Sequence, residues 1–399
     1  MIFLKTRSQE KIDQYLLYLK SVGSFSNLYS SSSKPYVQYR VAENTFCKAF
    51  DAENLARADA AYDALIDGFG IGIKTFILAG NSKIEKIAEF NSFSAELRGF
   101  SGLDLARRLA HYRNLRITTA DRIYGVDKRV YHIIGRDAYK IKIFEVGYDL
   151  IDLENIEIIA ENKSSLKFRD NLNEYNFNFS KSVLMKRFNV PSDALEIEIS
   201  IIPDPINVLF RLFGEANEIG ADFLDIKNAI SDEMSLSTSE IEEQIPGVDY
   251  VVLPLYSPQS KLKNREPIVP LKSQLNQWNA GGRERDPGEV YIFIPIKLHH
   301  EYGDFFPGRD MPFNLRIPSG EVLSAKVCQE NGKALMTNPN NAMSNWILRR
   351  VLGLEPGELL QYSRLVEVGF DAVKITKIDN FNFLIDLTQV DGYEEFINE

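Results

Sequence analysis

The chain has 399 residues, 44% of them hydrophobic and 26% charged, with a formal net charge of −10, which suits two or three globular domains with sizeable cores. No run approaches the about 18 consecutive apolar residues of a membrane span, and the N-terminus lacks the pattern of a secretory leader. Two cysteines and four histidines exclude a disulfide framework and leave no recognisable zinc pattern, so we expect a cytoplasmic protein with no membrane partner.

The first 130 residues have the pattern of a mixed α/β fold. Helices are predicted over residues 8–22, 38–56, 82–91 and 102–114. Between the second and third helices, the segments "AAYDALI" and "FGIGIKTFILAG" are predicted to be strands. They meet at Asp67-Gly68, a dipeptide typical of tight hairpin turns.

From about residue 130 to residue 205 the pattern becomes that of strands. Four segments alternate apolar and polar residues between turn signals: "YKIKIFEVGYDLIDL", "IEIIAEN", "SLKFRD" and "EYNFNFSKSVLMKRF". These strands either complete the fold of the first half or form a separate small β module. We therefore predict an α/β domain with a β-rich extension over residues 1–205.

Residues 206–247 are predicted to be an acidic helical linker, because residues 214–246 hold nine acids and one lysine. Residues 248–399 are again strand-rich, with helices predicted over 341–353 and 357–368, and we expect a β-barrel domain. Residues 257–285 carry six Lys or Arg against two acids, and residues 83–129 carry ten against six. Two basic regions separated by an acidic connector favour a nucleic-acid partner, although a solvated surface explains such charges equally well.

Several kinds of chemistry are excluded by missing motifs. None of the four histidines is followed two residues later by lysine, so the His-x-Lys pairs of phospholipase-D-type nucleases are absent. The sequence also lacks a Gly-rich P-loop and a Gly-x-Ser-x-Gly nucleophile elbow. Metal-and-carboxylate chemistry remains.

The predicted hairpin provides residues for that chemistry. Folding at Asp67-Gly68 brings Asp63 close to Lys74 on the next strand, and Glu43 on the preceding helix can add a second carboxylate. Carboxylates hold Mg²⁺, which prefers oxygen ligands, and an ammonium group can orient a water and offset charge on a phosphorane. We predict that Glu43, Asp63 and Lys74 are catalytic and that Asp63 and Glu43 bind Mg²⁺.

This arrangement resembles the PD-(D/E)xK nuclease fold, which combines a helix glutamate, a strand aspartate and an acid-x-lysine on the following strand. The sequence departs from the pattern at Gly72-Ile73-Lys74, where glycine occupies the acid position. Glu43 or a later acid such as Glu89 would have to replace that acid.

Three other interpretations of these residues stay open. Asp152 with Glu161-x-Lys163 forms a competing acid-x-lysine pattern, at a strand end that runs into an exposed turn. An aspartate and a lysine on neighbouring strands are also often a plain surface ion pair. The arginines of "DLARRLAHYRNLR" fit either phosphate contacts or a solvated helix face.

Two amide-rich clusters in the second half contain the residues that read DNA bases, because Arg pairs with guanine and Asn or Gln with adenine. The first cluster is Gln274, Asn276, Gln277, Trp278, Asn279, Arg283 and Arg285. The second is Gln329, Asn331, Lys333, Asn338 and Asn340. Each adjoins a predicted strand, so each can be a recognition arm, although one such cluster alone is more often a polar surface loop.

Residues 249–380 resemble the C-terminal DNA-binding domain of NgoFVII-type restriction endonucleases, which is similar to the plant B3 domain and the EcoRII effector domain. The matching segments are "LNQWNAGGRERDPGEVYIFIP", "FFPGRDMPFNLRIPSGEVLSAKVCQENGKALMTNP" and "AVKITKID". The resemblance implies a B3-like β-barrel in which two arms grip the major groove of double-stranded DNA. The two amide-rich clusters are the expected arms.

That family's own catalytic half is of the phospholipase-D type, which this sequence lacks. The combination of an α/β nuclease half with the same reading domain is similar to the BisI-like group, whose members cut GCNGC-type sites, many of them requiring 5-methylcytosine. We therefore expect a Mg²⁺-dependent type II restriction endonuclease that acts as a homodimer on double-stranded DNA. A DNA-binding regulator without catalysis and a non-specific nuclease are the alternatives.

Overall fold

The computed structural model describes residues 1–55, 60–218, 250–258, 267–303 and 305–398. Contacts divide the chain into two compact units, residues 1–117 with 126–228, and residues 118–125 with 229–399. The change between units after residue 228 falls inside the predicted linker, which begins with the helix α5 (Pro205–Glu218); residues 219–247 of that linker lie outside the described residues. Among the described residues, no helix combines the length and the apolar character needed to cross a membrane.

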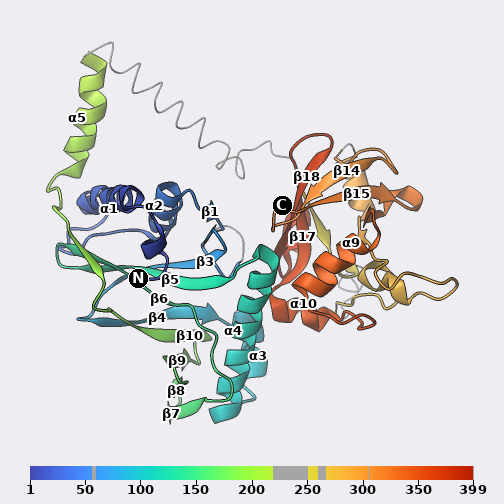
Figure 1. Cartoon of the computed structure of the whole chain (residues 1–399), viewed down its shortest axis with the longest axis horizontal. Coiled ribbons are helices and arrows are strands. Elements are labelled where there is room, and N and C mark those ends of the chain that lie inside the picture. The colour runs from blue at the N-terminus through green and yellow to red at the C-terminus, as the bar shows by residue number, and fades with distance from the viewer. Residues whose placement is uncertain (56–59, 219–249, 259–266, 304, 399) are drawn as a thin grey trace. The chain divides into compact units, whose positions relative to one another are not determined.

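The first unit is built on a six-stranded mixed sheet (Figure 1). Its order is β1-β2-β3-β5-β6-β11, in which β3 and β5 are parallel and the other neighbours are antiparallel. The strands are β1 (Glu53–Asn54), β2 (Ala64–Ile66), β3 (Phe69–Ile77), β5 (Lys128–Asp137), β6 (Lys140–Gly147) and β11 (Leu195–Glu198). The predicted hairpin is confirmed, since β2 and β3 join at Asp67 (φ 49°) and Gly68 (φ 74°).

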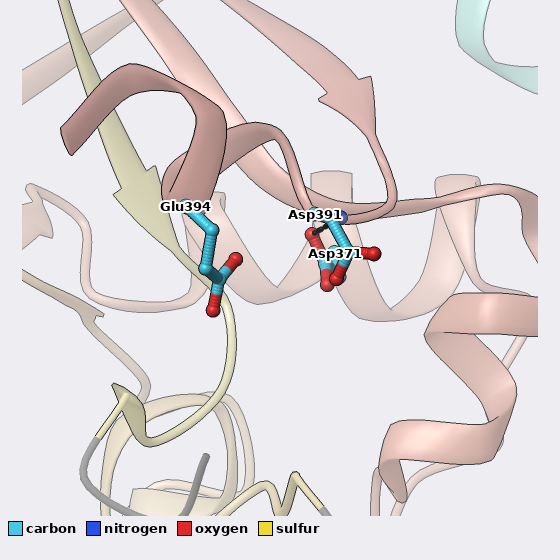
Figure 2. Close-up of side chains that lie close together, drawn as sticks. All are labelled: Asp371, Asp391 and Glu394. Atoms are coloured by element: carbon cyan, nitrogen blue, oxygen red, sulfur yellow. Dashed lines mark hydrogen bonds between the residues drawn. The ribbon is translucent and has the colours of Figure 1, made fainter. Parts of the chain in front are cut away.

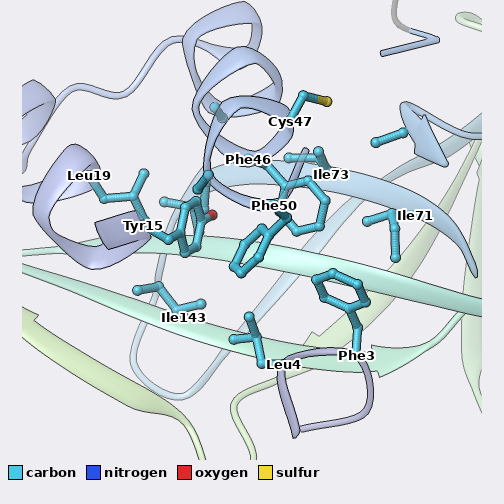
Figure 3. Packing of buried hydrophobic residues seen from close by; sticks show 14 of the residues in the cluster. Phe3, Leu4, Tyr15, Leu19, Phe46, Cys47, Phe50, Ile71, Ile73 and Ile143 are labelled. Atoms are coloured by element: carbon cyan, nitrogen blue, oxygen red, sulfur yellow. The ribbon is translucent and has the colours of Figure 1, made fainter. Parts of the chain in front are cut away.

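Helices α1 (Gln9–Ser24) and α2 (Tyr39–Phe50) cover one face of this sheet. Figure 3 shows the aromatic rings of Phe3, Phe46 and Phe50 packed together among aliphatic side chains of the strands, such as Ile71 and Ile143. Helix α2 was predicted to reach residue 56 but ends at Phe50, because Asp51 adopts a left-handed conformation (φ 55°) that closes the last turn. The core thus fixes α2 against β3.

A fully buried polar group anchors the N-terminal segment to this core. The carboxylate of Glu145 accepts hydrogen bonds from the backbone N–H of Ile2 (2.5 Å) and Phe3 (2.8 Å) and contacts His132 at 3.2 Å. The other ring nitrogen of His132 lies 2.8 Å from the hydroxyl of Tyr15. These contacts lower the pKa of Glu145 against the effect of its burial, and they give His132 a structural role.

A second, five-stranded antiparallel sheet also belongs to the first unit, in the order β4-β10-β9-β8-β7. Its strands are β4 (Ser82–Glu89), β7 (Glu157–Glu161), β8 (Ser165–Arg169), β9 (Glu174–Asn178) and β10 (Val183–Asn189). Side chains of α3 (Ser94–Leu97) and α4 (Gly102–Tyr124) share a core with it. The β-rich region therefore contributes to both sheets: β5, β6 and β11 extend the first, and β7 to β10 build the second.

The helix predicted over residues 82–91 is wrong, because these residues form β4. A bulge opposite Leu184 and Met185 inserts Ile87 into the ladder and breaks the alternation of inward and outward side chains. The apolar spacing that results imitates a helix. The predicted helix over 102–114 is confirmed and continues to Tyr124 as α4.

The second unit contains a seven-stranded, nearly closed barrel-like sheet in the order β12-β17-β18-β14-β15-β16-β13. The strands are β12 (Tyr250–Pro254), β13 (Ile292–Phe293), β14 (Pro312–Arg316), β15 (Val322–Cys328), β16 (Ala334–Thr337), β17 (Phe370–Lys377) and β18 (Asn382–Gln389). Short helices lie between the strands: α8 (Ile296–Glu301), α9 (Asn341–Ser344), which continues as η6 (Asn345–Val351), and α10 (Tyr362–Val368). A further helix, α11 (Gly392–Asn398), follows β18. The predicted strand-rich architecture with two inserted helices is confirmed.

Candidate functional site

Asp63 is held rigidly at the entry to the β2–β3 hairpin. Its backbone N–H donates to the carbonyl of Ile71 (2.8 Å), and its carboxylate Oδ2 accepts from the backbone N–H of Ile73 (2.6 Å). This side-chain bond occupies one carboxylate oxygen. The carboxylate therefore has a fixed direction close to Lys74, the half-buried residue that follows Ile73 on β3.

Glu43 reaches the same place from α2. Its side chain is only 7% exposed, and one of its oxygens lies 3.2 Å from Nη1 of Arg40, one turn earlier on the helix. Both the charge of Asp63 and the charge of Lys74 act on Glu43. The three predicted residues thus lie within electrostatic range of one another, and the structure adds Arg40, which sequence reasoning missed. A basic residue three positions before a helix glutamate was the available signal.

The electrostatics of this group, which we call the carboxylate pair, are those of two like charges withdrawn from water. Burial, reinforced by the charge of Asp63, raises the pKa of Glu43 to about 7, although Arg40 and Lys74 act against the rise. Burial also raises the pKa of Asp63, while Lys74 and the Ile73 amide oppose that effect. Such displaced pKa values are frequent at functional sites, where burial and neighbouring like charges are arranged to shift them.

The glycine at the acid position has a structural explanation. A Cβ on Gly72 would lie 2.9 Å from ring atoms of Tyr131 and of Tyr148. Those two rings stack with centroids 3.9 Å apart, and the Tyr148 hydroxyl donates to the carbonyl of Ala61. The aromatic stack fills the space that an acidic side chain would need, so a further carboxylate must come from another element.

The carboxylate pair fits a hard divalent cation. Glu43 and Asp63 offer oxygen ligands, which Mg²⁺ prefers, and a cation between them would stabilise the charged form of Glu43, which burial and the charge of Asp63 disfavour. Lys74 lies close enough to act on both acids. Binding of the metal and the catalytic roles of these residues stay predictions.

The three alternative acids lie elsewhere and have other partners. Glu89 is exposed on β4 and pairs with Lys86 at 3.0 Å. Glu161 is exposed at the end of β7, where it accepts from the N–H of Gly102 at the start of α4. Asp152 accepts hydrogen bonds from the turn that follows it. None of these contacts connects an alternative acid to Asp63.

Another acidic group lies in the second unit. Carboxylate oxygens of Asp371, Asp391 and Glu394 lie within 4.8 Å of one another, and this is the only such group of three potential metal ligands among the described residues (Figure 2). The hydroxyls of Tyr362 and Tyr256 donate to Asp371 and Glu394, and the N–H of Asp391 donates to Asp371. Carboxylates of this group thus already accept hydrogen bonds from other groups of the protein.

The first amide-rich cluster is partly buried inside the second unit. Asn276 is completely buried, donates to the carbonyls of Pro270 and Leu360, and accepts from the N–H of Leu360 at 3.0 Å. Gln274 and Gln277 are buried as well. The predicted DNA contact of these three residues is not supported by this structure, because all three side chains are buried and the amides of Asn276 and Gln277 are bonded within the protein.

Other members of that cluster reach the surface. Asn279 is exposed, although its amide also donates to the carbonyl of Leu271 (3.0 Å), and Trp278 is half-buried. The side chain of Arg283 is 62% exposed and that of Arg285 is 19% exposed. Arg283 is therefore the more accessible of the two arginines in this cluster.

The second cluster is largely exposed, as a reading surface requires. Asn331, Lys333, Asn338 and Asn340 are exposed, and Gln329 is half-buried. Gln329 and Asn331 have positive φ angles of 67° and 59°, so the segment turns sharply after β15. Gln329 also donates to Gln277 of the first cluster at 3.3 Å, which ties the two clusters together within the unit.

Glu289 was missed by sequence reasoning, although it contacts three members of the first cluster. Its Oε1 accepts from Arg283 Nη2 (2.6 Å), Gln277 Nε2 (2.8 Å) and Arg285 Nη1 (2.9 Å). It is 5% exposed. An acid that follows two arginines and precedes a buried strand was the available signal, since such a carboxylate must be paired when it is buried.

Comparisons with known proteins bear on the second unit. A comparison with curated proteins found no match. Residues 254–379, less than half of the chain, match the family model described as the NgoFVII C-terminal B3-like DNA-binding domain, a domain of restriction enzymes. The match covers β13 to β17 and both amide-rich clusters, and it identifies this region as similar to that DNA-binding domain.

Proposed function

We propose that this protein is a type II restriction endonuclease that hydrolyses double-stranded DNA in a Mg²⁺-dependent, sequence-specific reaction. The supporting observation is the convergence of Glu43, Asp63 and Lys74 in a chain whose residues 254–379 match a DNA-binding domain of restriction enzymes. The first unit would then be a PD-(D/E)xK-like nuclease domain. The second unit, with its B3-like domain, would choose the site.

The roles of the residues follow from their chemistry. Glu43 and Asp63 would hold the ion, and bound Mg²⁺ supplies polarisation of the phosphodiester and a lower pKa for a coordinated water. Lys74 orients the attacking water and offsets the charge that develops on the phosphorus oxygens. The water oxygen forms a new bond to phosphorus as the bond to the 3′ oxygen breaks in line, which leaves a 3′-hydroxyl.

The finer expectations belong to the same proposal. The exposed residues of the two clusters would contact the major groove, with Arg283 as the strongest candidate for guanine. A BisI-like enzyme would cut at a GCNGC-type site, with or without a requirement for 5-methylcytosine. Cutting both strands of a near-palindrome favours a homodimer, because protein symmetry tends to mirror site symmetry.

The decisive experiment incubates the purified chain with methylated and unmethylated plasmid in Mg²⁺, with EDTA as the control. Discrete fragments that need Mg²⁺ would support the proposal, and their dependence on methylation would settle that requirement. Intact DNA that the protein nevertheless binds specifically would favour a non-catalytic regulator. A smear from every plasmid would indicate a non-specific nuclease.

Lys74→Ala tests the catalytic site directly. We expect it to abolish cleavage and to leave specific DNA binding almost unchanged, because Lys74 lies at the carboxylate pair and not among the reading residues. Cleavage is followed on plasmid and binding by fluorescence anisotropy. Lys20→Ala, which removes an exposed lysine of α1, is the matched control. Normal cutting by Lys74→Ala would exclude the site.

A further inference from the structure

The carboxylate of Glu289 lies at the centre of a hydrogen-bonded group that joins both amide-rich clusters. A single oxygen of this buried side chain accepts from Gln277, Arg283 and Arg285. Gln277 in turn accepts from Gln329 of the second cluster (3.3 Å). Glu289 is therefore connected to exposed and buried members of the first predicted arm and, through Gln277, to the half-buried Gln329 of the second.

The segment around Arg283 has few other constraints. A Cβ at Gly281 or Gly282 would meet nothing within 4 Å, and residues 281–284 are exposed. Arg285 donates from Nε to the carbonyl of Ala280 (3.1 Å), which closes the loop around these glycines. In the part of the chain that the structure describes, the hydrogen-bonded ion pair with Glu289 is thus the contact that fixes the direction of Arg283.

The contacts of Glu289 with the two arginines are also ion pairs. The guanidinium groups of Arg283 and Arg285 both lie within 2.9 Å of the same oxygen, and without the negative charge between them they would repel each other. Charge-assisted hydrogen bonds of this kind are strong and directional. Because the Arg283 side chain remains 62% exposed, its other N–H groups stay available to a ligand.

We propose that Glu289 is a positioning residue for DNA reading, which holds Arg283 in the orientation that meets a base edge and couples it to Gln329. This inference rests on the proposed function of the second unit. A guanine contact needs both donors of the arginine fork in a fixed plane, so a supporting side chain determines whether the arginine discriminates between bases. Arg285, whose side chain is mostly buried, helps to hold Glu289 in place and is not expected to meet a base itself.

The test first identifies the preferred sequence of the unmodified full chain by selection from a random-core DNA duplex library, with and without 5-methylcytosine. Binding of the selected duplex and of a random duplex is then measured by fluorescence anisotropy in EDTA, so that cleavage does not interfere. We expect Glu289→Gln to reduce the ratio of these affinities by about tenfold or more, within the range for one specific arginine–base contact. Binding of the random duplex should not weaken.

Two comparisons separate positioning from general effects. Glu284→Gln removes the same charge from an exposed residue of the same segment, and it should leave the ratio unchanged. The double variant Arg283→Ala with Glu289→Gln should lose no more discrimination than Arg283→Ala alone, since Glu289 acts through Arg283. Additive losses, or a normal ratio for Glu289→Gln, would overturn the proposal.

Folding is monitored by the melting temperature of each variant. If Glu289→Gln does not fold, Glu289→Asp keeps the charge and withdraws the carboxylate by one methylene group; it should lower the ratio, and an unchanged ratio would reject the role of Glu289. If the unmodified chain selects no sequence, the proposed DNA-reading function fails and this inference fails with it. If the chain selects a sequence that Glu289→Gln reads equally well, only the inference fails.

Discussion

At the scale of single residues, Glu43 combines an unfavourable position with a proposed function. Its pKa of about 7 lies well above the ordinary 4.5, mainly because the group is buried. Between pH 4.5 and 7 the unfolded chain loses this proton before the folded chain does, so the folding free energy becomes less favourable as pH rises. Above pH 7 the penalty is complete. Residues that are costly for folding and close to a second charge are typical of active sites.

Replacing Glu43 by Gln should therefore stabilise the protein while it abolishes cleavage. At about 1.4 kcal/mol per pH unit, the displaced pKa corresponds to at most about 3 to 4 kcal/mol, reduced by the lost contact with Arg40. We expect a higher melting temperature for Glu43→Gln at pH 8 in EDTA and almost no difference at pH 4.5. Glu10→Gln, an exposed control on α1, should change neither. A lower melting temperature at pH 8 would contradict this account of the site.

At the scale of elements, β3 bears Lys74, and the packing of this strand against an aromatic stack determines which side chains it can hold. Parallel pairing with β5 places Gly72 opposite Tyr131, and the stacked rings of Tyr131 and Tyr148 occupy the space of a side chain at position 72. Tyr131 also packs against Phe188 of the second sheet at 5.3 Å. The aromatic stack therefore couples the two sheets of the first unit at the strand that bears Lys74.

Gly72→Ala tests this arrangement. The added methyl group would lie 2.9 Å from both rings, and overpacking of this kind costs about 1–3 kcal/mol. We expect a lower melting temperature, and no gain of activity for Gly72→Asp, although it restores the acid of the nuclease pattern. Gly281→Ala, where a Cβ meets nothing within 4 Å, is the control. An unchanged melting temperature for Gly72→Ala would show that the rings move aside easily.

At the scale of the whole molecule, recognition and cleavage are assigned to different compact units of one chain. Each chain has one Glu43, one Asp63 and one Lys74, which supply a single proposed site, whereas a double-strand break needs two strand cuts. A homodimer supplies two sites with the symmetry of a near-palindromic target.

Mixing experiments test the proposed dimer. Unmodified chain mixed with an excess of Lys74→Ala, which retains DNA binding, should form mixed dimers that cut only one strand. Nicked plasmid should then accumulate, whereas the unmodified chain alone should give linear DNA. Gel electrophoresis measures the two products. If the mixture only slows linearisation and no nicked plasmid accumulates, the chains do not cut as a dimer that shares its two sites.

The sequence by itself determined the features that depend on neighbouring residues. The turn at Asp67-Gly68 follows from two residues that tolerate positive φ, and it was sufficient to predict that Asp63 and Lys74 lie close together. Alternation of apolar residues likewise predicted the strand-rich second unit. Local preferences failed at β4, where a bulge imitates helical spacing.

Only the tertiary structure decided which polar residues are available to a ligand. Asn276 and Asn331 look alike in the sequence, yet Asn276 is buried with its amide bonded to Pro270 and Leu360, and Asn331 is exposed. The pKa of Glu43, the aromatic stack under Gly72 and the contacts of Glu289 also arise from residues distant along the chain. Burial and charge pairing are sums over such distant neighbours, so no local pattern contains them.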